Sequence, residues 1–122
     1  LTVANITRLH AAYRSSNLRE RLERHHGTNV DALFDNWTRV WLSDEFRQWN
    51  IEEYLPRIDC PLLAIQGEGD EYGSMEQLVR IRRGLRGPCE LVQLPACGHA
   101  PFRDQPQATL AALTGFLGEH CA

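Results

Sequence analysis

Two different hydrophobic patterns divide the chain. Up to about residue 58, apolar residues recur every three or four positions, as they do on one face of a helix. The opening run of Val3, Ile6, Leu9 and Tyr13 is the first example. The apolar–polar alternation that is typical of a strand does not occur in this part of the sequence. We therefore expect residues 1–58 to form a helical segment.

The main helix of this segment is expected after Thr28-Asn29-Val30-Asp31, which resembles a capping box. Its apolar face holds Leu33, Phe34, Trp37, Val40 and Trp41. Aromatic residues at helical spacing usually belong to a core. The alternative, that Trp37 and Trp41 line an apolar substrate pocket, stays open.

From about residue 59 the pattern changes to short apolar runs that end at turn residues. Residues 61–67 (P-L-L-A-I-Q-G) are typical of a strand that is buried on both faces, and residues 90–94 (E-L-V-Q-L) predict a second strand. Between them, Ser74 begins a capping box and a helical stripe, which Gly87-Pro88 ends. Pro106 begins a final helix. This order predicts a βαβα unit with parallel strands.

The two patterns together predict an α/β fold with a helical segment at residues 1–58 and a βαβα unit at residues 59–122. Two parallel strands do not make a complete sheet, because parallel sheets are normally covered on both faces by further elements. We therefore expect the chain to be the carboxyl-terminal part of a larger protein. An exposed strand edge should make the isolated chain dimerise, aggregate or bind its missing amino-terminal half.

The composition is that of an ordinary globular protein, with 43% hydrophobic and 24% charged residues. A net charge of -3 gives no basic field for nucleic acid, and all 13 basic residues are arginines. The sequence contains no apolar run long enough to span a membrane and no recognisable signal segment. We therefore expect no nucleic-acid or membrane partner and a cytoplasmic location. The cysteines at positions 60, 89, 97 and 121 form no C-x-x-C pair, so reduced thiols are expected rather than a zinc site.

Candidate catalytic residues follow the two predicted strands. Asp70 comes three residues after the first strand, and His99 follows the second within Cys97-Gly98-His99. The carboxyl ends of neighbouring parallel strands meet at one edge of a sheet, so Asp70 and His99 should lie close together. A carboxylate that accepts the imidazole Nδ1–H fixes the tautomer in which Nε2 can take a proton. Glu68 and Glu71 remain rival acids.

The stretches I-D-C-P-L-L-A-I-Q-G-E-G-D-E-Y-G and L-P-A-C-G-H-A-P-F-R-D-Q-P resemble the last two strands of an α/β-hydrolase-fold enzyme. In that family the acid follows the penultimate strand in a G-x-x-D pattern, which Gly67 and Asp70 match. The catalytic histidine stands in a G-H-x-P loop, which Gly98, His99 and Pro101 match. The helical segment is similar to the family's cap.

The resemblance implies a partial α/β-hydrolase fold in which Asp70 and His99 are catalytic and no cofactor is used. The substrate would be a small ester, thioester, amide or carbon–carbon bond compound held near Trp37, Trp41 and Ala100. The family's nucleophile elbow G-x-S-x-G is missing, because the chain's only serines are Ser15, Ser16, Ser43 and Ser74. We therefore expect the isolated chain to be inactive.

Several alternatives stay open at this point. The alternatives to the favoured acyl-transfer hydrolase are a dehalogenase, an epoxide hydrolase or a lyase of the same fold, and a non-catalytic fragment or interaction module. His25-His26 does not indicate a metal site, since adjacent side chains on a helix diverge by about 100°. The loop Gly67-x-Gly69-x-x-x-Gly73 carries three carboxylates and is a poor phosphate cradle. No metal or cofactor is therefore expected.

Overall fold

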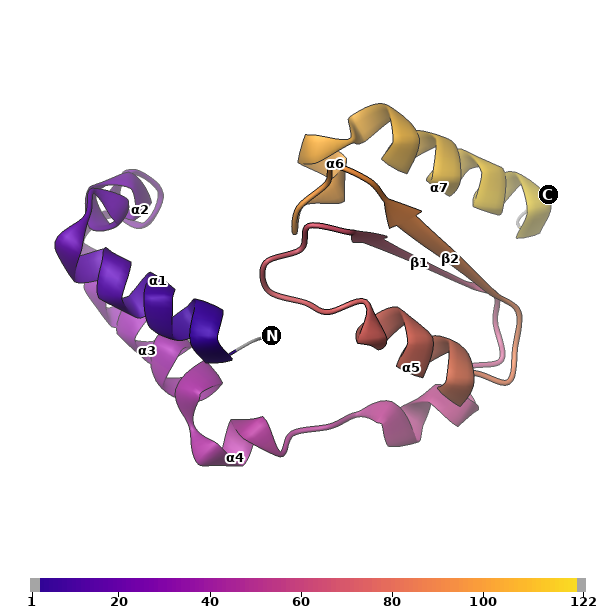
Figure 1. Cartoon of the computed structure of the whole chain (residues 1–122), viewed down its shortest axis with the longest axis horizontal. Helices are drawn as coiled ribbons and strands as arrows, with labels where there is room; N and C mark the ends of the chain where they lie inside the picture. The colour runs from indigo at the N-terminus through magenta and orange to yellow at the C-terminus, as the bar shows by residue number, and fades with distance from the viewer. Residues whose placement is uncertain (1–2, 121–122) are drawn as a thin grey trace. The chain divides into compact units, whose positions relative to one another are not determined.

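The computed structural model describes residues 3–120, and the chain divides between Trp49 and Asn50 into two compact units (Figure 1). The division comes earlier than the boundary expected after residue 58. The reason is η2 (Glu52–Arg57), a 3₁₀ helix that packs against α5 (Glu76–Gly84) of the second unit. The Leu55 side chain lies directly against Gly84, where a larger residue would not fit.

The first unit consists of helices only within the described residues, as its hydrophobic spacing predicts. Its elements are α1 (Val3–Ser15), α2 (Leu18–His26), the 3₁₀ turn η1 (Gly27–Asn29), α3 (Val30–Leu42) and α4 (Asp44–Arg47). Gly27 ends α2 with a φ of 56°, a left-handed conformation that glycine adopts without steric cost. Ser43 caps α4, because its hydroxyl oxygen accepts a hydrogen bond from the Phe46 backbone N–H.

The core of this unit lies where α1 meets α3. Tyr13, Val30 and Phe34 are buried there, and the rings of Tyr13 and Phe34 stack at 3.8 Å between centroids. The Tyr13 hydroxyl donates a hydrogen bond of 2.7 Å to Asp31, which also receives two hydrogen bonds from Arg19. These donors, the Arg19 guanidinium first, lower the pKa of Asp31 to about 2. Burial of Tyr13 and its bond to Asp31 raise the tyrosine pKa to about 12.

The second unit contains the sheet. Its strands β1 (Leu62–Gly67) and β2 (Cys89–Leu94) run parallel, with Leu62 opposite Cys89 and Gly67 opposite Leu94. The chain crosses from one strand to the other through α5, and α6 (Pro101–Asp104) and α7 (Pro106–His120) follow β2. The predicted order of strand, helix, strand, helix is confirmed, with α6 as an additional short helix. The structure is thus a mixed α/β protein.

Helices cover the sheet on two sides. Figure 1 shows α7 on one side of the strands and α5 on the other, and both helices contact the strands. The covering is partial, because in β1 only Gln66 and Gly67 are buried and the other residues are half-buried. The expectation that this strand is buried on both faces is therefore wrong for its first four residues. Among the described residues the sheet has two strands, so each strand has one edge without a strand partner.

The helix ends show where capping patterns mislead. α5 begins at Glu76 after Met75, and its N-cap forms no side-chain hydrogen bond, so Ser74 does not cap the helix as expected. Asn29 precedes α3, again without a side-chain cap bond. Both helices are held by packing instead, through Leu78 in α5 and through Val30 in α3.

Between residues 3 and 120, no helix combines the length and the apolar character needed to cross a bilayer.

Candidate functional site

The candidate site lies beyond the carboxyl ends of β1 and β2. Because Gly67 and Leu94 are partners in the strand register, the two loops that follow them start side by side. Backbone hydrogen bonds join these loops: Glu68 N–H donates to Leu94 O at 3.0 Å, and Gly69 N–H donates to Cys97 O at 2.9 Å. The ladder of the sheet therefore continues into both loops and fixes their relative position.

Gly67 allows the loops to come this close. A Cβ atom at residue 67 would overlap the backbone carbonyls of Cys97 and Gly98. Backbone atoms cannot rotate away as a side chain can, so only glycine fits. Residue 67 is thus a steric requirement of the site as well as the end of a strand.

Replacing Gly67 by alanine should lower the free energy of unfolding by about 1–3 kcal/mol, the usual cost of forcing an extra carbon into a tightly packed place. The matched control is Gly118→Ala, because residue 118 lies in α7 and a Cβ there would meet nothing within 4 Å. Alanine is the better helix former by about 1 kcal/mol, so the control should be neutral or stabilising. Urea unfolding of both variants measures the difference. Equal stability of Gly67→Ala and the parent would refute the close approach.

Asp70 is held rigidly by its own loop. Its Oδ1 accepts backbone hydrogen bonds from Tyr72 at 2.9 Å and Gly73 at 3.1 Å, an arrangement in which the carboxylate shapes the turn. Its Oδ2 accepts a hydrogen bond of 3.0 Å from the amide of Gln66, the buried residue near the end of β1. The Asp70 side chain is only 7% exposed as a result.

These hydrogen bonds keep Asp70 ionised. Burial by itself raises the pKa of the carboxyl, but the donors from Tyr72, Gln66, Gly73 and His99 together outweigh it and hold the pKa below its usual value. The site therefore contains a fixed negative charge at neutral pH.

His99 meets this charge directly. Its Nδ1 lies 2.9 Å from Asp70 Oδ1, a hydrogen bond that requires the proton on Nδ1 when the imidazole is neutral. The ring also packs edge-on against Tyr72, with 5.0 Å between centroids. The His99 side chain is nevertheless 59% exposed. Nδ1 of His99 is thus hydrogen-bonded to Asp70, and the rest of the ring is accessible to solvent.

The loop that carries His99 is fixed at several points. Ala96 has a φ of 50°, a left-handed conformation that alanine rarely adopts. The Gln105 amide donates hydrogen bonds to Pro95 O and Ala96 O, and Gly98 N–H donates to Asp104 at 3.0 Å. Asp104 in α6 and Gln105 directly after it therefore fix the turn, and their contacts maintain the strained backbone conformation of Ala96.

Cys97 is buried at 3% exposure beside this histidine. Burial, followed by the charges of Asp104 and Asp70, raises the pKa of its thiol. A buried, protonated thiol is a poor nucleophile. This environment is that of a packing residue.

No nucleophile is paired with His99 in the described part of the chain. Within residues 3–120, no hydroxyl or thiol forms a hydrogen bond with its imidazole. The hydroxyls of Ser15, Ser16 and Ser43 donate instead to helix carbonyls. The described geometry therefore contains an exposed imidazole paired with a carboxylate.

The three residues expected to line a substrate pocket fall in different units. Trp37 borders an open apolar pocket of about 350 Å³ in the first unit. Its lining is Leu9, Leu22, His26, Val30, Leu33, Phe34 and Trp37. Trp41 is not part of this lining and packs edge-on against Phe46 at 4.4 Å between centroids. Ala100 lies in the second unit, where its carbonyl accepts the backbone N–H groups of Arg103 and Asp104 in α6.

Sequence reasoning missed two residues that position the pair, Gln66 and Tyr72. Gln66 interrupts an apolar strand at a buried position, which is the signal that its amide has a specific partner. Tyr72 lies two residues after Asp70, where a turn bonded to the aspartate could have been foreseen.

No protein-family model and no curated protein sequence matches the chain. Among solved structures, the chain is similar to a membrane phospholipase A described as a bacterial virulence factor, with a TM-score of 0.60 and 26% sequence identity. The match covers 84% of this chain and 33% of that protein, so the chain spans about a third of the phospholipase's length.

These comparisons correct the assignment to the α/β-hydrolase superfamily. No family model for that superfamily matches, and the similar structure is known as a membrane phospholipase A. The motifs around Gly67-x-x-Asp70 and Gly98-His99-x-Pro101 describe strands that end in tight turns, and such turns are not specific to one superfamily. The comparisons thus support a similarity to one kind of hydrolase, the phospholipase A.

Proposed function

We propose that the chain supplies the histidine and aspartate of a hydrolase that cleaves carboxylic esters of lipids. The observation that carries the proposal is the 2.9 Å contact between His99 Nδ1 and the buried Asp70 carboxylate, with the imidazole otherwise exposed. The likeness to a phospholipase A supports the choice of lipid esters.

In the proposed reaction His99 acts first as general base and then as general acid. Asp70 accepts the Nδ1–H, which leaves the lone pair on Nε2 to take a proton from the attacking hydroxyl. The ionised carboxylate stabilises the imidazolium that forms. His99 then returns this proton to the departing alcohol, and water completes the cycle by releasing the fatty acid.

The nucleophile and the oxyanion donors are proposed to come from outside residues 3–120. For the nucleophile, the proposal is supported by the pairing of His99, which has no hydroxyl or thiol partner within that range. The edge of β1 that has no strand partner offers backbone groups to which a further segment can bind. We propose that this segment carries the nucleophile.

The pocket of the first unit is proposed, by itself, to bind a hydrocarbon chain. This pocket of about 350 Å³ is bordered by aliphatic and aromatic side chains, with His26 as the one polar member of the lining. An apolar pocket of this kind suits a hydrocarbon chain. Trp37 is therefore proposed to contact a hydrocarbon chain in this pocket, while Trp41 packs beside it.

The function can be tested with vesicles of diacyl phosphatidylcholine and the complete protein to which this chain belongs. We expect release of free fatty acid and lysophospholipid, detected by mass spectrometry, with one oxygen from labelled water in the fatty acid. Vesicles of the ether-linked analogue are the matched control, because they contain no carboxylic ester and should give no product.

Two results would count against the proposal. If the complete protein leaves the diacyl lipid intact but binds it, the His99–Asp70 pair has no hydrolytic role on lipids. If it cleaves only short water-soluble esters, the reaction class stands and the lipid substrate is wrong.

A further inference from the structure

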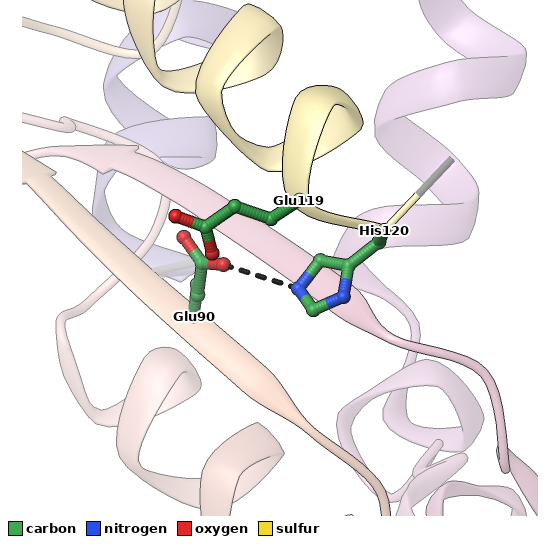
Figure 2. Close-up of side chains that lie close together, drawn as sticks. All are labelled: Glu90, Glu119 and His120. Atoms are coloured by element: carbon green, nitrogen blue, oxygen red, sulfur yellow. Dashed lines mark hydrogen bonds and ion pairs between the residues drawn. The ribbon is translucent and has the colours of Figure 1, made fainter. Parts of the chain in front are cut away.

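A second group of polar side chains lies at the other end of the strands. Glu90 is the second residue of β2, whereas Glu119 and His120 end α7. Figure 2 shows the two carboxylates facing each other and the imidazole directed at Glu90. One ligand atom from each residue lies within 4.8 Å of the others. The group is separate from Asp70 and His99, which follow the carboxyl ends of the strands.

The two carboxylates of this group have few basic partners in the part of the chain that the structure describes. Within residues 3–120, neither Glu90 nor Glu119 forms an ion pair with an arginine, and the sequence has no lysine. Among the described residues, His120 is the basic partner of this group, at 3.3 Å from Glu90. The carbonyl groups at the end of α7 add further negative potential at this point. A protonated imidazole neutralises one carboxylate and leaves the second.

We propose that Glu90, Glu119 and His120 bind a divalent transition-metal ion, with zinc as the preferred class. One imidazole nitrogen and two carboxylate oxygens are ligands that zinc takes readily, whereas Ca²⁺ and Mg²⁺ favour oxygen alone. At zinc–ligand distances of about 2.0–2.2 Å, two ligands of a tetrahedral ion lie about 3.3–3.6 Å apart. The 3.3 Å between His120 Nε2 and Glu90 Oε1 fits this spacing.

The side chains can reach the ion with small movements. His120 is 24% exposed in its side chain and rests against Phe116 at 4.7 Å between centroids, which limits rotation of the ring. Glu119 is exposed and free to rotate its carboxylate toward the pair. Water completes the coordination. The ion would join the end of α7 to the start of β2 and so fasten the helix across the sheet.

The test is zinc titration of the full chain by calorimetry, with the metal-free melting temperature of each variant as the check on folding. We expect one zinc ion per chain in the parent. Glu119→Gln and His120→Ala should each weaken binding at least tenfold, and a zinc concentration that just saturates the parent should raise the melting temperature of the parent more than that of either variant. Glu119 has no ion pair among the described residues, so its replacement by glutamine leaves the metal-free fold unchanged.

Two control variants distinguish zinc binding at this site from zinc binding by another histidine or by a cysteine. His25→Ala removes a histidine of the first unit, and Cys89→Ser removes a thiol next to Glu90. Both should bind zinc as the parent does, and cobalt in place of zinc should show no sulfur-to-metal charge-transfer band. The proposal is overturned if the parent binds no zinc at micromolar concentrations, if Glu119→Gln and His120→Ala bind as tightly as the parent, or if Cys89→Ser abolishes binding.

Discussion

Replacing His99 by alanine should lower kcat of the complete protein by about 10⁴–10⁶-fold, because the variant has no group to accept the proton of the nucleophile. KM should change little, since the imidazole contributes to proton transfer rather than to binding of the acyl chain. The side chain is 59% exposed, so the fold should survive its removal. Steady-state kinetics on diacyl phospholipid and the melting temperature of the same sample measure the two effects separately.

The matched control for this variant is His25→Ala, which removes an exposed histidine from α2. Its kcat should equal that of the parent. If His99 only closes a turn, His99→Ala would lower the melting temperature and leave kcat per folded molecule within about tenfold, a barrier change of ~1.4 kcal/mol. That outcome would remove His99 from the mechanism.

Replacing Asp70 by asparagine should lower kcat by about 10³–10⁴-fold, somewhat less than the loss of the base itself. The neutral amide no longer stabilises the imidazolium. Its NH₂ group would also face the Gln66 amide, which now donates to Asp70 Oδ2 at 3.0 Å, so donor would meet donor. We therefore expect a lower melting temperature as well, and kcat must be expressed per folded molecule.

Glu68→Gln is the control for Asp70→Asn, because it removes a neighbouring carboxylate from the same loop and tests a rival acid. It should keep kcat within about tenfold of the parent. The double variant lacking both His99 and Asp70 should be no slower than His99→Ala, since both residues serve one proton transfer. Additive losses would mean that Asp70 acts independently of the histidine.

The candidate site could be predicted to a useful extent from the sequence because its geometry depends on local patterns. The apolar runs before Gly67 and at 90–94 locate two strands, and the parallel pairing follows from the helix between them. Once the strand ends are adjacent, Asp70 and His99 come within reach of each other. The contact between His99 and Asp70 therefore follows from the parallel pairing of β1 and β2.

Other features depend on contacts that no local pattern contains. Glu90 and His120 are 30 residues apart and meet only because α7 runs back along the sheet. The short helix α6 begins at Pro101, and the Gln105 amide after it donates a hydrogen bond to Pro95 O. A hydrophobic pattern predicts neither feature. The family assignment failed for a different reason. Short loop motifs report a local turn, and many folds contain such turns.

The position of Asp70 is set within its own loop, from Gln66 to Gly73, whereas His99 comes from a loop 29 residues away and arrives only through the pairing of β1 with β2. A slip of one residue in that pairing would shift the loop by about 3.3 Å and turn every side chain of the strand to the other face. The hydrogen bond between the two residues would then be lost. Molecules with a neighbouring register would lack this pair, so under the proposed function the specific activity of a preparation would measure its correctly paired fraction.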